Sequence, residues 1–187
     1  MNTTALRHSE ADRPLTEVIS SLRADDWNAA SPCEGWTARD VVAHLVDTQR
    51  EFLTGRGLDV GERPDLGDAV QAWTTHAARV ARILADDATA GTPFDGYFGP
   101  STIGATFERF YVWDMLVHRW DLARSAGLDA WFTDTELDRI EAGIDGFGDS
   151  LYMEGICAPA VPAPEDADRL TRVLARLGRN TTAPVRG

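Results

Sequence analysis

Apolar residues recur every three or four positions along most of this chain, which is the spacing of one buried helical face. Val41, Val42, Leu45 and Phe52, for example, would lie on one side of a helix. With Gly and Pro residues taken as helix ends, the pattern predicts helices over residues 13–23, 37–55, 68–88, 102–126 and 134–152, and a short terminal helix over residues 168–177.

The segment 102–126 stands out because it is apolar on nearly every side, and such a helix is buried on nearly every side. We therefore expect it at the centre of the fold. The stretches between helices are rich in Gly and Pro, and no segment has the alternation of a good strand, so residues 90–100 are expected to form a loop. The sequence predicts an all-α four-helix bundle with an extra short C-terminal helix and a loose tail from Gly178 onward.

We expect a single domain over residues 1–187, with its core at about 13–152 and a C-terminal extension at 153–187. The chain has 18 Lys plus Arg against 30 Asp plus Glu, a net charge of -12, which argues against nucleic acid or an anionic membrane as a partner. Its two cysteines form no disulfide framework, and we see no signal peptide or membrane span. The expected location is the cytoplasm.

Three polar residues lie where the pattern predicts burial. His44 interrupts the apolar stripe of the second helix, and Asp114 and His118 lie four positions apart in the most apolar helix. Residues at that spacing share one helical face, and an ionised Asp there needs a partner or a cation. Two imidazoles and one carboxylate form a plausible three-ligand site for a divalent metal. A hydrogen-bonded core histidine and a simple Asp–His helix pair are the alternatives.

Other side chains are candidates to support such a site. Asp121 lies three positions after His118 and could orient its ring, or it could pair with Arg124 instead. Asp47 and Glu51 could share the face of His44, although both also fit a solvated surface.

Cys33 could act as a nucleophile or a fourth ligand only if its loop folds back over the site. His8 and His76 have no partner pattern, so we expect them on the surface. Phe107, Tyr111 and Trp113 are either pocket-lining residues or plain core.

Two segments resemble a known family. Residues 31–45, SPCEGWTARDVVAHL, and residues 114–124, DMLVHRWDLAR, are similar to two signatures of the DinB-like superfamily. More narrowly, they resemble the mycothiol-dependent maleylpyruvate isomerase N-terminal group of actinobacteria. Residues 158–167 and 174–179 resemble the C-terminal part of a subgroup known only as predicted metal-binding proteins. The resemblance extends over roughly residues 13–179.

The resemblance implies an up-down-down-up bundle that holds a divalent metal between helices. His44 matches the first histidine of the family, and Asp114 and His118 match its acidic-x-x-x-His pair. The isomerase has Glu where this chain has Asp, so a metal would lie closer to the fourth helix or carry more water. Isomerase relatives also have a C-terminal domain, for which this chain has no room, and we therefore do not expect isomerisation of maleylpyruvate itself.

A thiol bound to a divalent metal loses its proton near neutral pH and can attack an electrophile. This chemistry predicts a metal-dependent thiol transferase or isomerase that acts on a small electrophile, with a mycothiol-type thiol implied as co-substrate by the resemblance. Zinc is the first choice of metal, with nickel, iron or manganese as alternatives. Two alternatives remain open: a bundle that binds a metal or a small molecule without catalysis, and a metal-dependent hydrolase. The sequence does not decide whether the metal site is catalytic, or whether the protein is a monomer or a homodimer.

Overall fold

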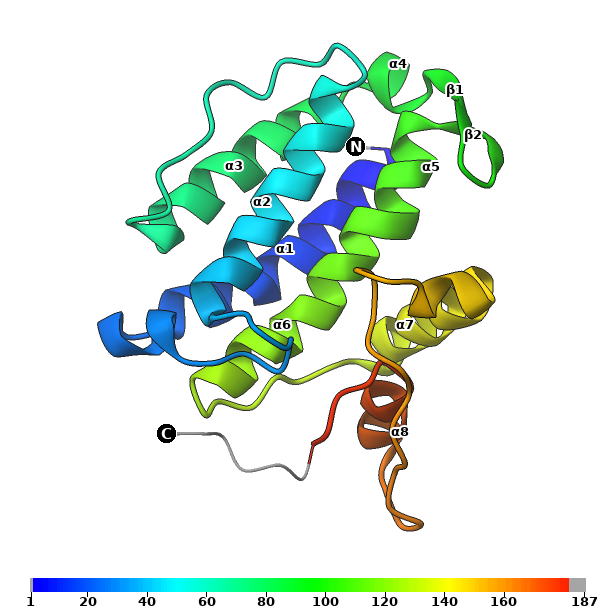
Figure 1. The fold of residues 1–187 in the computed structure, drawn as a ribbon. Coiled ribbons are helices and arrows are strands. Elements are labelled where there is room, and N and C mark those ends of the chain that lie inside the picture. The colour runs from blue at the N-terminus through cyan, green and yellow to red at the C-terminus, as the bar shows by residue number, and fades with distance from the viewer. Residues whose placement is uncertain (1, 182–187) are drawn as a thin grey trace.

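The computed structural model describes residues 2–181 and consists mostly of helices around one bundle (Figure 1). Its bundle helices are α1 (Thr3–Ser21), α2 (Ala38–Thr54), α3 (Ala69–Leu84) and a continuous run of α5 (Ile103–Phe107), a π-helical turn (Glu108–Val112) and α6 (Trp113–Ser125). The predicted all-α bundle is confirmed.

The four helices enclose one core, because α1 contacts α3 and α6, and α2 contacts the same two helices. Figure 1 shows α2 and α3 running in one direction and α1 and α6 in the other, which is the up-down-down-up order. Large, almost fully buried side chains from every helix fill the interior: Leu15, Ile19, Leu45, Leu53, Trp73, Leu84, Phe107, Met115, Leu116 and Leu122.

The parallel order of α2 and α3 requires a long connector, residues 55–68, that runs back along the bundle. Two arginines of the flanking helices hold its backbone. Arg50 Nη2 donates to the carbonyl of Gly61 at 2.7 Å, and Arg79 Nη1 donates to the carbonyl of Glu62 at 3.0 Å. These contacts fix an otherwise irregular segment to α2 and α3.

The first helix is longer than predicted. We expected it over residues 13–23, but α1 begins at Thr3, where the Asn2 side chain accepts a hydrogen bond from the backbone N–H of Ala5 at 2.9 Å. Its early buried face consists of small and polar residues, Ala5, His8 and Ala11, which carry no apolar signal in the sequence.

The prediction of a loop over residues 90–100 is partly wrong. A one-turn helix, α4 (Asp87–Ala90), precedes a two-stranded antiparallel hairpin of β1 (Pro93–Gly96) and β2 (Gly99–Thr102). Its register pairs Pro93 with Thr102 and Gly96 with Gly99, so Tyr97 and Phe98 form the two-residue tip. Strands of four residues are too short for an alternating pattern to show.

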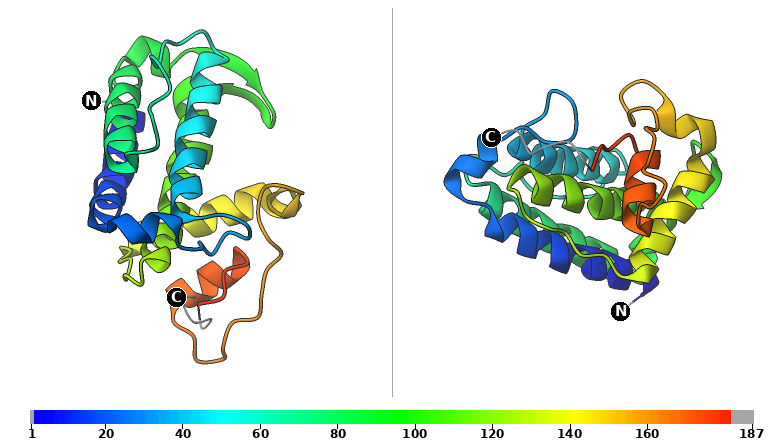
Figure 2. Two further views of the ribbon diagram at one scale, coloured as in Figure 1. Left: turned by 60° about the vertical axis from the view of Figure 1, so that its left-hand side comes forward. Right: turned by 90° about the horizontal axis from the view of Figure 1, so that it is seen from below.

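Beyond the bundle, α7 (Asp134–Phe147) packs against α6, and α8 (Arg169–Arg176) packs against α7 on one side of the molecule (Figure 2). The helix α7 was expected to continue to residue 152, but it ends at Phe147. The next residue, Gly148, has a φ of +53° and begins a 3₁₀ turn (Gly148–Tyr152). The terminal helix is confirmed, and the segment 158–164 has no regular structure, as predicted.

Two histidines expected at the surface are buried in the bundle. His8 of α1 is 0% exposed and His76 of α3 is 1% exposed. His76 Nε2 lies 3.0 Å from Oε1 of the buried Gln49 of α2. Neither ring nitrogen of His8 has a hydrogen-bond partner within residues 2–181, nor does Nδ1 of His76. Among the same residues, no helix combines the length and apolar character needed to cross a membrane.

Candidate metal centre

The α2–α6 seam brings His44, Asp114 and His118 together. The helix α2 begins at a capping box in which the Thr37 and Asp40 side chains satisfy each other's backbone N–H groups. Apolar residues on either side of His44 are buried in the bundle, so the imidazole is held at the edge of that face, opposite α6. Asp114 and His118 lie one turn apart on α6 and face it.

Both imidazoles point their Nε2 atoms at the same carboxylate. His44 Nε2 lies 2.9 Å from Oδ2 of Asp114, and His118 Nε2 lies 3.3 Å from its Oδ1. Two donors bound to one tetrahedral zinc ion are about 3.3 Å apart. The three donor atoms all lie within 4.8 Å of one another, so they could hold a metal ion. This donor set, two nitrogens and one oxygen, suits zinc and other borderline divalent ions.

The centre is partly open to solvent. The side chains of His44 and Asp114 are 29% and 23% exposed, whereas that of His118 is 6% exposed. Trp36, from the loop before α2, covers both rings, with its ring centroid 4.9 Å from that of His44 and 6.1 Å from that of His118. The exposed side is where a further ligand could approach.

A buried carboxylate fixes the other nitrogen of His118. Asp121 is fully buried, and its Oδ2 lies 2.8 Å from His118 Nδ1. With Nδ1–H donating a hydrogen bond to this carboxylate, a metal that replaced the Nε2 proton would meet an Nε2 lone pair directed toward Asp114. The interpretation that Asp121 orients His118 agrees with this geometry.

Arg179 is the residue that pairs with Asp121, although the sequence suggested Arg124. Its Nη2 donates to Asp121 Oδ2 at 2.8 Å and its Nε donates to Oδ1 at 3.2 Å. Arg179 lies in the segment from Gly178 onward that was expected to be a loose tail, and because its side chain is buried, that prediction is wrong for this residue. Residues 182–187 of the predicted tail lie outside the described residues. No local spacing links Arg179 to Asp121, which is why sequence reasoning missed it.

Opposite charges keep this cluster ionised despite its burial. Burial alone would raise the pKa of Asp114, but the charge of His118 and hydrogen bonds from both imidazoles hold it far below its usual range. Burial would lower the pKa of His118, but Asp114 and Asp121 raise it well above its ordinary value. Arg179 and His118 likewise outweigh burial and lower the pKa of Asp121. A bound cation would take the place of the proton on His118.

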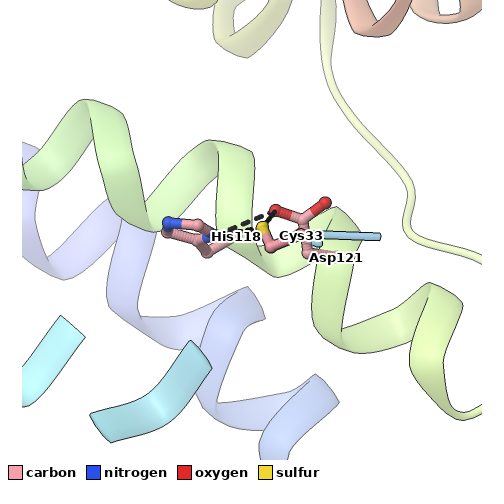
Figure 3. A group of neighbouring side chains, drawn as sticks. All are labelled: Cys33, His118 and Asp121. Atoms are coloured by element: carbon pink, nitrogen blue, oxygen red, sulfur yellow. Dashed lines mark hydrogen bonds and ion pairs between the residues drawn. The ribbon is translucent and has the colours of Figure 1, made fainter. Parts of the chain in front are cut away.

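Cys33 lies beside the buried side of His118, because its loop does fold back onto α6. Figure 3 shows the thiol next to His118 and Asp121; Sγ is 4.0 Å from His118 Nδ1 and donates to Asp121 Oδ2 at 3.4 Å. These three side chains form a second group that could hold a metal. However, the Arg179 guanidinium donates to both carboxylate oxygens and, at 3.5 Å, to Cys33 Sγ. The positive charge of Arg179 thus already occupies this position, so the group of His44, Asp114 and His118 fits a metal better.

The remaining candidates lie elsewhere. Asp47 forms an exposed ion pair with Arg63 at 2.7 Å, and Glu51 is exposed, so both belong to the solvated face of α2. Phe107 is fully buried core. Trp113 donates from Nε1 to the carbonyl of Ile140 in α7 at 3.1 Å, on another side of the helix.

Comparisons with known proteins agree with this architecture. The sequence model of the mycothiol maleylpyruvate isomerase N-terminal domain matches residues 8–123. Two uncharacterized proteins from two strains of Mycobacterium tuberculosis are each 27% identical to this chain over 179 residues, which is 93% of this chain and 96% of theirs. No solved structure matches significantly.

Proposed function

Because the chain belongs to the mycothiol maleylpyruvate isomerase N-terminal domain family, we propose that it is a divalent-metal-dependent enzyme that joins a mycothiol-type thiol to a small electrophile, as a transferase or isomerase. His44, Asp114 and His118 are the proposed metal ligands. The observation that carries the proposal is that two imidazole Nε2 atoms face one carboxylate at 2.9 and 3.3 Å.

The partial exposure of the centre favours catalysis over a purely structural metal. Structural zinc sites are closed by four protein ligands, whereas catalytic sites have three and leave a position for water or substrate. Here three donors converge, and two of them, His44 and Asp114, reach solvent. A divalent metal, when bound, stabilises a thiolate at neutral pH.

The protein's own residues prepare this centre. Asp121 accepts a hydrogen bond from Nδ1–H of His118, and Arg179 keeps that carboxylate charged. The ring of His118 is thereby held in one orientation, with its proton on Nδ1, so that Nε2 is the nitrogen available to a metal. Trp36 packs over both imidazoles and shields one side from water, leaving the exposed edge of His44 and Asp114 for the thiol and the electrophile.

Metal content tests the ligand assignment. We expect the protein purified without chelator to hold about one divalent ion per chain by inductively coupled plasma mass spectrometry. His118→Ala should lose it. Asp47→Ala, which removes an exposed carboxylate one turn from His44, should retain it. Equal metal in His118→Ala and wild type, with both folded by circular dichroism, would contradict the assignment.

Turnover with and without thiol tests the chemistry. With zinc, mycothiol and the fluorogenic electrophile monochlorobimane, the wild type and Asp47→Ala should accelerate conjugation, and His44→Ala should be slower by on the order of 100-fold. Product formed without thiol would contradict the proposal and favour a hydrolase. Metal binding with no acceleration would favour a non-catalytic metal-binding bundle instead.

A further inference from the structure

A cavity lies under the β1–β2 hairpin, where the hairpin packs beside α5 (Figure 1). It has a volume of about 250 Å³. Five aromatic rings from three parts of the chain line it: Phe52 of α2, Phe94 and Phe98 of the hairpin, and Phe110 and Tyr111 of the π-helical turn. Flat walls of this kind suit a flat apolar molecule.

Two guanidinium groups lie against these rings. The Arg56 guanidinium carbon is 3.7 Å from the ring centroid of Phe52 and 4.1 Å from that of Phe94. That of Arg109 is 4.3 Å from the centroid of Phe98. Stacking on aromatic faces leaves the edge of a guanidinium, which carries its N–H donors, free to bind an anion.

Neither arginine has an acidic partner within residues 2–181. Arg56 donates from Nη1 to the carbonyl of Phe52 at 2.9 Å, while its buried Nε has no partner. Arg109 donates to the carbonyl of Gly146 at 3.0 Å. No Asp or Glu lines this cavity, although the chain carries a net charge of -12 and the other two described cavities each include at least one Glu. The cavity is therefore a locally positive site in an acidic protein.

The cavity is separate from the candidate metal centre. None of His44, Asp114 and His118 lines it. Phe52 and Tyr111 pack against each other in its wall, with ring centroids 4.9 Å apart. Phe52 is eight positions after His44, about 12 Å along the helix axis, so a molecule in this cavity would lie more than two helical turns from that residue.

We propose that this cavity binds a small organic carboxylate with a flat apolar body, the carboxylate on Arg56 and the body against the aromatic wall. The binding site itself needs no metal, and it is distinct from the metal centre proposed above. Arg109 and the half-exposed Phe98 close the side of the cavity nearest the hairpin tip.

Calorimetric titration of the full-length, metal-free protein tests the proposal. The probes are 1-naphthoate and its neutral counterpart 1-naphthalenemethanol. We expect naphthoate to bind at least about tenfold more tightly than the alcohol, because a carboxylate pairs with the guanidinium. Arg56→Met should abolish that preference. Arg82→Met, which removes an exposed arginine that donates only to its own helix, should leave it unchanged.

Further variants separate the possible failures. Phe98→Ala should weaken both probes, since it removes a ring that both would contact. Arg56→Gln, which also removes the charge, replaces Arg56→Met if the latter does not fold. Equal affinity for the two probes, or equal loss in Arg56→Met and Arg82→Met, would overturn the proposal. Loss of naphthoate binding in His118→Ala would also overturn it, because the carboxylate would then be bound at the metal centre.

Discussion

At the scale of single residues, the orientation of His118 depends on a buried chain of charges. Asp121 binds its Nδ1, and Arg179 binds both oxygens of Asp121. Carboxylates that hold a ligating imidazole typically change metal affinity 10- to 100-fold when they are altered. Because Asp121 and Arg179 lie 58 positions apart, this support belongs to the folded chain and not to a local motif.

We predict that Asp121→Asn lowers zinc affinity about 10- to 100-fold, because a neutral amide accepts the Nδ1 proton less strongly than a carboxylate. Competition with a chromophoric chelator measures this. Asp47→Asn, an exposed carboxylate on α2, should bind zinc like the wild type. If the affinity of Asp121→Asn is unchanged while the protein remains folded, Asp121 does not support a metal ligand.

Removing Arg179 should destabilise the fold far more than removing an exposed arginine. Arg179→Met leaves the fully buried Asp121 without its main counter-charge, which costs about 3–5 kcal/mol. Arg63→Met breaks a pair whose side chains are 50% and 47% exposed, which costs less than about 1 kcal/mol. Urea unfolding of both variants measures the difference. Similar decreases in the free energy of unfolding would show that the buried Arg179–Asp121 pair stabilises the fold no more than the exposed pair does.

At the scale of elements, close packing between α6 and α7 attaches the C-terminal segment that begins at Asp134 to the bundle. Gly143 of α7 makes this approach possible. A Cβ atom there would lie 2.1 Å from Nε1 of Trp113, the atom that donates to the carbonyl of Ile140. The helix therefore needs glycine at this position despite its low helical propensity.

We predict that Gly143→Ala destabilises the protein by about 1–3 kcal/mol, because the indole must move and its hydrogen bond is strained. Gly146→Ala is the matched control, since a Cβ there would meet only Arg109 Nη2, at 3.9 Å. That variant should be neutral or slightly more stable, as alanine favours helix. Thermal unfolding compares the two, and an equal effect would contradict the close contact at Gly143.

The sequence predicted elements well where local chemistry decides them. The Thr37–Asp40 capping box starts α2 at Ala38, one residue after the predicted start, and Gly127, with a φ of +66°, follows the end of α6. It failed where tertiary contacts decide. The first turns of α1 bury Ala5, His8 and Ala11 but no large apolar side chain, and the hairpin strands are too short to show alternation, so the beginning of α1 and the hairpin were both missed.

At the scale of the whole molecule, the bundle encloses polar groups without satisfying all of them. His8, Gln49 and His76 come from three different helices, and each has at least one buried nitrogen without a partner among residues 2–181. Burial, with the charge of Arg50 nearby, lowers the pKa of His76 to about 3. Sequence spacing could not reveal this cluster, because its members meet only when α1, α2 and α3 pack.

This burial predicts acid sensitivity. The unfolded chain binds a proton on His76 below about pH 6.5, whereas the folded protein does not until about pH 3, so stability is complete above pH 6.5 and falls as the pH drops below it. Between pH 7.5 and 5.0, in the presence of chelator, the wild type should lose about 2 kcal/mol more stability than His76→Gln. Urea unfolding at both pH values measures this, and equal losses would contradict it.

The sequence pattern could predict the three proposed metal ligands but not every residue that supports them. The i, i+4 spacing of Asp114 and His118 already placed them on one helical face, and the structure adds His44 from α2 at hydrogen-bond distance. Of the supporting residues, Asp121 was predicted from its spacing to His118, whereas the positions of Cys33 and Arg179 could not be predicted in the same way. Cys33 and Arg179 reach the site from a loop and from the C-terminal segment, whose paths the local pattern does not determine.

The proposed chemistry depends on one divalent metal ion held by His44, Asp114 and His118. An anomalous difference map at the metal absorption edge, from crystals of protein purified without chelator, would locate such an ion and its ligands. We expect a single strong peak about 2.0–2.2 Å from both Nε2 atoms and from a carboxylate oxygen of Asp114. A peak between Cys33 and Asp121, or ordered imidazoles with no peak between them, would show that these three residues do not form a metal site.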